Sequence, residues 1–352
     1  MIWNAWTSTT SLPTKEGYWF LTTDVTCGQS GIAADNHVYL DLAGRTVTGN
    51  SGSRVYATFN TNSHLTITDS SAKETGKLVA TGTSTDQGKV VWVRYGSFTL
   101  FGGTLDASAA STTSNGAAVY LPGGCSFTMN GGQIISGTAG LGGGIYSGGT
   151  VVINGGLIQR GENATGVLIH TTGAKASLTL NGGTVDSATF AGNGLQTAAV
   201  TATSAASVIL DGGTILGKPC GLYLYDAVLE LKSGTIGGAY VYVNGNLNKG
   251  STANIYGGTI ENGIYVYRGT AHLEGAPVIT GGYGLKLASG KTFSLGDLLE
   301  GAQILLTCED TGRIVASVIA DPTDTQFILP ADETLELYYL DEQGLFLNKR
   351  TV

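Results

Sequence analysis

The sequence predicts an all-β protein: a right-handed, single-stranded parallel β-helix of about eleven coils with a small C-terminal β cap. Three observations predict this fold. A short glycine-rich word recurs along the chain, alternating apolar runs precede its copies, and the composition is unusual. Of 352 residues 55 are Gly, and only 12% are charged. Such a chain turns often and keeps like charges from stacking on neighbouring strands.

The recurring word reads hydrophobic, any residue, Gly-Gly, Thr or a similar residue, hydrophobic. Its copies are Leu100–Leu105, Met129–Ile134, Ile153–Ile158, Leu180–Val185, Leu210–Ile215 and Ile255–Ile260, with degenerate copies at Leu231–Ile236 and Leu273–Val278. Successive copies lie 18 to 30 residues apart. Propeller blades need about 40 or more residues, so the period favours the coils of a β-helix, with length differences absorbed in outward loops.

Alternating apolar runs lie upstream of the copies, as in Gly221–Tyr225 and Gly263–Tyr267. A period of two indicates strands, and no window shows a helical period. Each coil is therefore expected to hold two or three short strands, with Gly-Gly supplying a corner of positive φ. The residues before the Gly pairs, Asn130, Asn154, Asn181 and Asp211, are expected to form a ladder that stabilises these turns.

The chain is expected to have three parts: an N-terminal cap at 1–17, the β-helix at 18–296 and a β-rich capping module at 297–352. Ile2, Trp3 and Trp6 are suited to covering the first coil, because a solenoid must close its open ends. Composition changes near residue 297. Residues 1–296 hold 15 Lys and Arg and 15 Asp and Glu, whereas residues 297–352 hold 3 and 11 and so carry the whole net charge of −8.

The bulk chemistry excludes several classes of partner. A net charge of −8 disfavours nucleic acid, and no apolar run is long enough to insert into a membrane. The segment Met1–Thr10 lacks the pattern of a signal peptide, which fits either a cytosolic protein or a piece of a longer secreted chain. Cys27, Cys125, Cys220 and Cys308 show no metal or redox spacing, so we expect buried free thiols, no metal site and no cofactor.

Several segments resemble a known group of proteins. Tyr18–Val25 (YWFLTTDV) and Val38–Val47 (VYLDLAGRTV) look like the opening coil of the β-helix repeats in large, adhesin-like surface proteins of gut anaerobic bacteria. Further similar segments are Leu65–Ser71 with Gly76-Lys77-Leu78, the Gly-Gly-Thr-Ile coils, and Leu285–Thr307 with its Ser289-Gly290-Lys291-Thr292 and Leu299-Glu300-Gly301-Ala302. The resemblance covers nearly the whole chain and implies the pectate-lyase-like fold. It says little about function, because many such proteins have no assigned activity.

Aligning the coils by their inward apolar residues places aromatic side chains in an external row. This row reads Trp92, Tyr120, Tyr146, Leu168, Gln196, Tyr223, Tyr242 and Tyr265, with Arg94, Pro122, His170, Ala198, Tyr225 and Tyr267 in a neighbouring row. The register of Tyr240 against Tyr242 is open by two residues. Aromatic faces stack on sugar rings, so the candidate ligand-binding residues are Trp92, Arg94, Tyr120, Tyr146, Tyr223, Tyr225, Tyr265 and Tyr267. The alternative is that the rings only stabilise the sheet through cross-strand pairing.

A catalytic reading requires an acid–base pair, since glycoside hydrolysis uses two carboxyls about 5 to 10 Å apart. Candidates are Glu162, His170, Asp186 and Asp226, provided that loops bring them together. The characteristic words of β-helix polygalacturonases are absent from the chain. The basic residues near the row (Arg94, Arg268 and Lys286) are dispersed, unlike those of a pectate-lyase site.

The sequence therefore predicts a non-catalytic, extracellular or cell-surface segment of a bacterial protein that binds glycans along the aromatic row. A polysaccharide hydrolase or lyase is one alternative, and a passive spacer is another. We expect the chain to be a monomer and a fragment of a longer protein.

Overall fold

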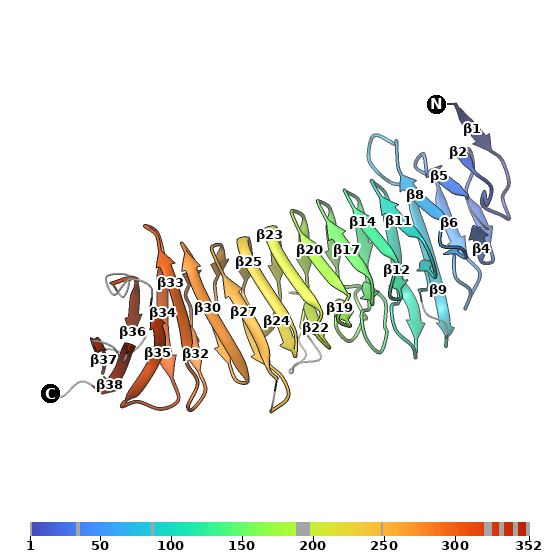
Figure 1. Cartoon of the computed structure of the whole chain (residues 1–352). Helices are drawn as coiled ribbons and strands as arrows, with labels where there is room; N and C mark the ends of the chain where they lie inside the picture. Colours follow the sequence, from blue (N-terminus) through green and yellow to red (C-terminus); the bar gives the residue numbers. More distant parts are fainter. Residues whose placement is uncertain are drawn as a thin grey trace. The chain divides into compact units, whose positions relative to one another are not determined.

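The computed structural model confirms the predicted class: the described residues form 38 strands and no α-helix, and almost all strand pairing is parallel (Figure 1). It describes residues 2–32, 36–85, 88–187, 198–247, 249–319, 326–330, 334–340 and 344–349. The chain divides into two compact units, residues 1–192 and 193–352. Each unit is a stack of coils with three strand-bearing faces, which we name A, B and C.

In the first unit, each strand pairs with the strand one coil later on the same face. Face A holds β1 (Trp3–Trp6), β2 (Gly17–Leu21), β5 (His37–Asp41), β8 (His64–Thr68), β11 (Ser97–Leu100), β14 (Ser126–Met129), β17 (Thr150–Ile153) and β20 (Ser177–Leu180). Face B holds β3 (Val25–Cys27), β6 (Thr46–Gly49), β9 (Lys77–Ser84), β12 (Thr104–Thr112), β15 (Gln133–Ile135), β18 (Leu157–Gln159) and β21 (Thr184–Asp186). Face C holds β4 (Ser30–Ile32), β7 (Tyr56–Thr58), β10 (Val91–Val93), β13 (Val119–Leu121), β16 (Ile145–Ser147) and β19 (Ile169–Thr172).

The second unit repeats this order, but several of its strands run across the A–B corner. Face C holds β22 (Val200–Thr203), β24 (Cys220–Tyr225), β26 (Tyr240–Asn244), β29 (Ile264–Val266) and β32 (Leu285–Leu287). Faces A and B are built by β23 (Ser207–Leu216), β25 (Val228–Gly237), β27 (Ser251–Ile255), β28 (Thr259–Ile260), β30 (Gly269–Gly275), β31 (Val278–Ile279), β33 (Phe293–Leu298), β34 (Gln303–Cys308), β35 (Arg313–Ile319) and β36 (Ile328–Pro330). In Figure 1 the arrows of β25, β27, β30 and β33 lie side by side.

The two ends of the chain use different pairing. β1 adds a parallel strand beside β2; its Trp3 and the preceding Ile2 are exposed (39% and 80%), while Leu12 in the connection to β2 is buried. Parallel pairing continues past residue 296 through β36. The C-terminal strands β37 (Leu335–Leu340) and β38 (Gly344–Lys349) then form an antiparallel hairpin, and β38 pairs with β35.

The Gly-Gly word forms the corner between faces A and B, as predicted. Its first hydrophobic residue ends the face A strand and its last lies in the face B strand. The second Gly has positive φ, 77° at Gly132 and 91° at Gly156. A Cβ at Gly156 would lie 2.5 Å from the carbonyl oxygen of Gly132, so both the φ value and the close stacking of coils require glycine there.

The asparagine ladder predicted at this corner is confirmed in the first unit. The Asn154 side-chain nitrogen donates to Asn130 Oδ1, and the Asn181 side-chain nitrogen donates to Asn154 Oδ1, each at 2.8 Å. In the second unit Ser233 Oγ donates to Asp211 Oδ1 at 3.5 Å. Amide side chains therefore link neighbouring coils outside the core.

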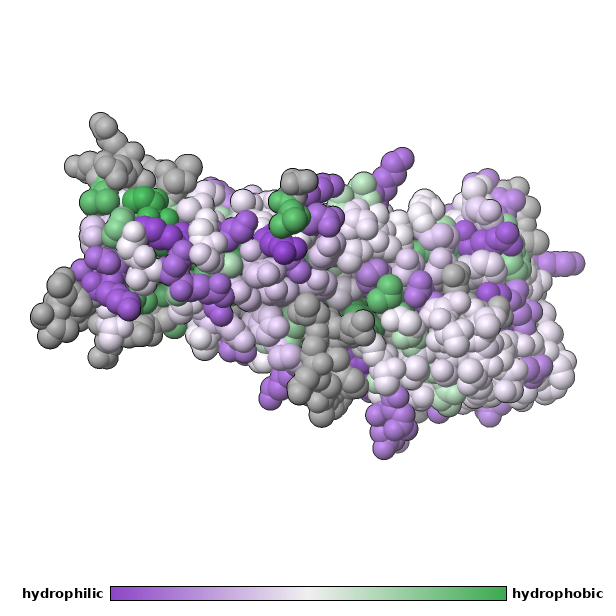
Figure 2. All heavy atoms as spheres, turned by 90° about the horizontal axis from the view of Figure 1, so that it is seen from below, coloured by the Kyte–Doolittle hydropathy of each residue, from purple (hydrophilic) through white to green (hydrophobic). Residues whose placement is uncertain are grey.

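The core contains apolar side chains that repeat from coil to coil. Phe98 on β11 and Phe127 on β14 are buried and stack with ring centroids 4.9 Å apart. Outside the core, Figure 2 shows a face on which residues of intermediate hydropathy cover most of the surface and strongly hydrophilic residues are scattered. The low charge of the sequence therefore corresponds to a surface of stacked small and neutral residues.

Candidate functional site

The external row of face C is where the sequence predicted ligand binding. In the first unit the pairing register aligns Trp92, Tyr120, Tyr146 and His170 on successive coils. His170 therefore belongs to the row itself, and the expected placement of Leu168 in the row is wrong, because Leu168 is fully buried. The sequence alignment failed there because the coil length changes just before β19.

The aromatic rings of the first unit cover one another. Tyr120 and Tyr146 are stacked with centroids 5.1 Å apart and planes 8° apart, and Tyr146 stacks on His170 at 5.3 Å. A ring face already in contact with the next ring is closed to a sugar. Tyr146 is thus covered by rings on both sides and Tyr120 on one side, a geometry that fits the alternative of cross-strand packing.

His170 is 5% exposed, and burial lowers its pKa to about 4. Its imidazole is therefore neutral at pH 7. Burial also raises the pKa of the Tyr146 hydroxyl beside it.

Trp92 has a different environment from the stacked tyrosines. Arg54 lies 4.1 Å and Arg94 5.3 Å from its ring centroid, and Phe59 meets its ring edge-to-face at 6.2 Å. Arg94 also lies 5.6 Å from the ring of Tyr95. A shallow hollow of about 210 Å³ is lined by Phe59, Asn60, Thr61 and Tyr95.

In the second unit the tyrosines form a cluster. The register aligns Tyr223, Tyr242 and Tyr265, which places Tyr242 and not Tyr240 in the row, and Lys286 follows on β32. Tyr242 stacks on Tyr223, with centroids 5.6 Å apart. Burial, reinforced by neighbouring tyrosines, raises the pKa of Tyr242 to about 12. Gln196, which was also expected in the row, lies outside the described residues.

Tyr267 follows the β29 strand and lies at the edge of this cluster. Its ring stacks on Tyr242 with centroids 6.0 Å apart, and Arg268 lies 5.2 Å from the ring. Tyr267 is 37% exposed. Tyr225 is committed within the protein, since its hydroxyl donates to Asn246 Oδ1 at 2.9 Å. Tyr267 is thus the aromatic side chain of this cluster with the most open surface.

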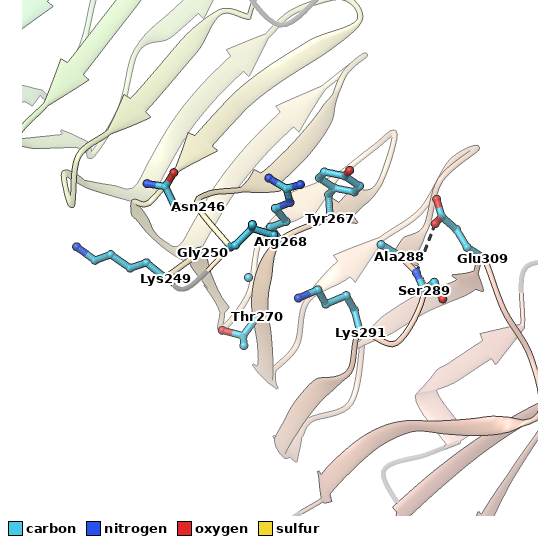
Figure 3. Close-up of a pocket in the computed structure, with 12 residues that line it drawn as sticks. Asn246, Lys249, Gly250, Tyr267, Arg268, Thr270, Ala288, Ser289, Lys291 and Glu309 are labelled. Atoms are coloured by element: carbon cyan, nitrogen blue, oxygen red, sulfur yellow. Dashed lines mark hydrogen bonds between the residues drawn. The ribbon is translucent and has the colours of Figure 1, made fainter.

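A pocket of about 500 Å³ lies beside Tyr267 (Figure 3). It is built from the corners that follow the face C strands β26, β29 and β32 and from the corner after β34, whose last residues pair with β32. The lining residues are Asn246, Leu247, Lys249, Gly250, Tyr267, Arg268, Gly269, Thr270, Ala288, Ser289, Lys291 and Glu309. The pocket therefore combines one aromatic ring, three cations and several neutral polar groups.

The carboxylate on the pocket wall is already bound by the protein. The Tyr265 hydroxyl donates to Glu309 Oε1 at 2.6 Å, the Ser289 backbone nitrogen donates to Oε2, and Lys286 lies 3.6 Å from Oε1. The Tyr265 hydrogen bond is the main cause of a lowered Glu309 pKa. Burial, and then this same bond, raises the pKa of Tyr265. Glu309 is therefore an anion whose charge is compensated by Lys286.

The four catalytic candidates are not brought together within one unit. Glu162 is exposed in the turn after β18, Asp186 ends β21 on face B, and His170 lies on face C. Asp226 belongs to the second unit, where it holds a turn: its Oδ1 accepts a hydrogen bond from the Asn246 backbone at 2.8 Å. In the first unit the two candidate carboxyls, Glu162 and Asp186, therefore lie on different elements, a turn and the end of a strand.

No group of three or more His, Cys, Asp or Glu side chains within the described ranges is placed to hold a metal ion. The cysteines are free thiols; Cys27, Cys125 and Cys220 are buried, as predicted, and Cys308 is half-buried. No helix in the described ranges is long and apolar enough to span a membrane.

Comparison of the chain with models of protein families, with curated proteins and with solved structures gave no match. The function must therefore be argued from the site itself.

The sequence reasoning missed the corner residues, among them Lys249 and Lys291, and the rings of Phe59 and Tyr95. Arg268 and Lys286 were noticed but taken as dispersed, whereas both lie against the tyrosine cluster. A signal existed, because the residues that follow each face C strand stack as regularly as the strands do. Aligning those positions brings Asn246, Arg268, Ser289 and Glu309 to neighbouring corners.

Proposed function

We propose that this chain is a non-catalytic segment of an extracellular or cell-surface bacterial protein and that it binds glycans. In this proposal the binding site is the tyrosine cluster of the second unit (Tyr223, Tyr242, Tyr265 and Tyr267) together with the pocket beside Tyr267. The observation that carries the proposal is Tyr267, the most exposed ring of the tyrosine cluster (37%), which lines this pocket.

The chemistry of the pocket suits a sugar. An aromatic ring offers an apolar face that can stack on a sugar ring. Thr270 supplies a hydroxyl group on the wall that can hydrogen-bond a sugar hydroxyl, whereas the Asn246 amide and the Ser289 hydroxyl also bond Tyr225, Asp226 and Asp310 within the protein. Small-ligand sites commonly combine an apolar platform with a few polar groups in this way, in volumes of about 300 to 1,000 Å³.

The pocket is less suited to catalysis. Glu309 is the one carboxylate among its lining residues, whereas glycoside hydrolysis requires two. Tyr265 and Lys286 already hold this carboxylate. These contacts support binding over hydrolysis.

The test is retention of the protein on a broad glycan array and on insoluble polysaccharides. We expect retention on a subset of glycans and a loss of about tenfold in affinity for Tyr267→Ala, which corresponds to about 1.4 kcal/mol. Tyr256→Ala is the matched control, because Tyr256 is also 37% exposed but lies at the A–B corner after β27.

Release of reducing ends or of unsaturated products is measured in the same incubations. Their appearance would establish a hydrolase or lyase in place of a binding protein. If the protein is retained on no glycan, the passive spacer remains as the function. If Tyr267→Ala and Tyr256→Ala lose the same amount of glycan affinity, the binding site does not lie at the pocket.

A further inference from the structure

The corner pocket carries positive charge that the protein does not compensate. Lys249, Arg268 and Lys291 line it, and in the described part of the chain none of the three forms an ion pair with a carboxylate. The nearest acid on the wall, Glu309, is matched by Lys286. In the same corner as Glu309, Asp310 is matched by Arg313, with Nε and Oδ1 2.5 Å apart.

This local charge contrasts with the unit that contains it. Residues 193–352 hold nine Lys and Arg and 16 Asp and Glu, a net charge of −7. A cationic hollow in an anionic unit attracts a small anionic group and repels a long polyanion that would also cross acidic surface. The charge pattern therefore favours a compact anion over nucleic acid.

The shape of the pocket is set by its corners. Figure 3 shows the Lys291 side chain extending toward the segment that carries Arg268, with Tyr267 on the same side, while the Lys249 side chain extends away from them. Gly250 and Gly269 line the pocket without side chains. A Cβ on Gly269 would lie 2.1 Å from the Ser251 carbonyl oxygen, so the two corners pack backbone against backbone and leave the space above them open.

We infer that this pocket binds an acidic sugar, whose carboxylate or sulfate group is held by Arg268 and Lys291 while the sugar ring lies against Tyr267. The inference rests on the proposed glycan-binding function and specifies its ligand class. Arg268 presents a planar fork of donors that matches an oxyanion, and Lys291 adds a point charge from the next coil. The aromatic ring and the neutral polar groups distinguish a sugar from an inorganic anion.

The test compares polymers that share one backbone: dextran, carboxymethyl-dextran and dextran sulfate. We expect at least one anionic form to bind at least about tenfold more tightly than dextran, with the preference reduced by salt. The two anionic forms separate carboxylate from sulfate recognition. Arg268→Gln and Lys291→Gln should each lower affinity for the preferred form by about tenfold. Lys232→Gln should not, because it removes an exposed charge on β25 that is paired with Glu230.

Several outcomes would overturn the inference. It fails if no anionic dextran is preferred, or if the Arg268 and Lys291 variants bind like Lys232→Gln. Equal binding of polyvinyl sulfate would show that charge alone is recognised, and tighter binding of an oligonucleotide would identify another class of ligand. The proposed function is judged separately: retention of neutral glycans that depends on Tyr267 would preserve it, and retention of no glycan at all would remove both.

Discussion

The buried imidazole of His170 should make the first unit sensitive to mild acid. Its pKa is lowered from 6.5 to about 4 by burial. In the unfolded chain His170 binds a proton as pH falls below about 6.5, whereas in the folded unit it stays neutral until about pH 4. The stability that the folded unit gains by holding His170 neutral is therefore fully present above pH 6.5. It is lost as the pH falls from 6.5 to about 4. At about 1.4 kcal/mol for each pKa unit, the loss is about 3 kcal/mol.

The assay is urea unfolding of the wild type and of His170→Gln between pH 7 and pH 4. Tryptophan fluorescence reports on the first unit, which contains His170, because all four tryptophans lie there: Trp3, Trp6, Trp19 and Trp92. The wild type should lose about 3 kcal/mol more than the variant across this range. An NMR titration that gave His170 a pKa near 6.5, or equal acid sensitivity of the two proteins, would refute the reasoning.

Three further predictions follow from the coils. Gly250→Ala should destabilise the second unit by more than about 2 kcal/mol, whereas Gly290→Ala should destabilise it by about 1 kcal/mol. Both glycines have φ near +70°. A Cβ at Gly250 would lie 2.8 Å from the Gly269 Cα, whereas a Cβ at Gly290 would have no atom within 4 Å. Thermal unfolding of the two variants checks this difference, and equal shifts would contradict it. Asn154→Ala removes two exposed hydrogen bonds and should cost about 1 to 2 kcal/mol in urea unfolding; no change would show that the ladder contributes nothing. Burial raises the pKa of the Cys220 thiol to about 12, so a disulfide reagent at pH 8 should modify it only after denaturation, and labelling of the native protein, located by mass spectrometry, would disprove this.

The architecture was accessible from sequence because its determinants are local and repeated. The Gly-Gly word specifies a corner by positive φ and by the absence of a side chain, and alternation specifies which residues enter the core. These rules placed the A–B corner and the asparagine ladder correctly. They failed at His170, because an unequal loop shifts the alignment of one coil and alternation alone does not show where the next strand starts.

The candidate site was less accessible. Sequence alternation identifies which tyrosines point outward, but not whether their faces are free. Tyr120 and Tyr146 proved to cover each other, whereas Tyr267 keeps open surface because its strand ends just before it. Lys249 and Lys291 were missed because corner residues obey no period of two and come together only through the stacking of coils.

The corner pocket also bears on how such a surface can change over time. Each coil contributes one short corner to it, and the cationic side chains of those corners lie outside the core. Duplication of a coil would lengthen the binding surface by about 4.8 Å without a new core, while substitution at a corner would change the chemistry without altering the length. The extent of the ligand that is recognised and its charge can therefore vary independently in proteins built from these coils.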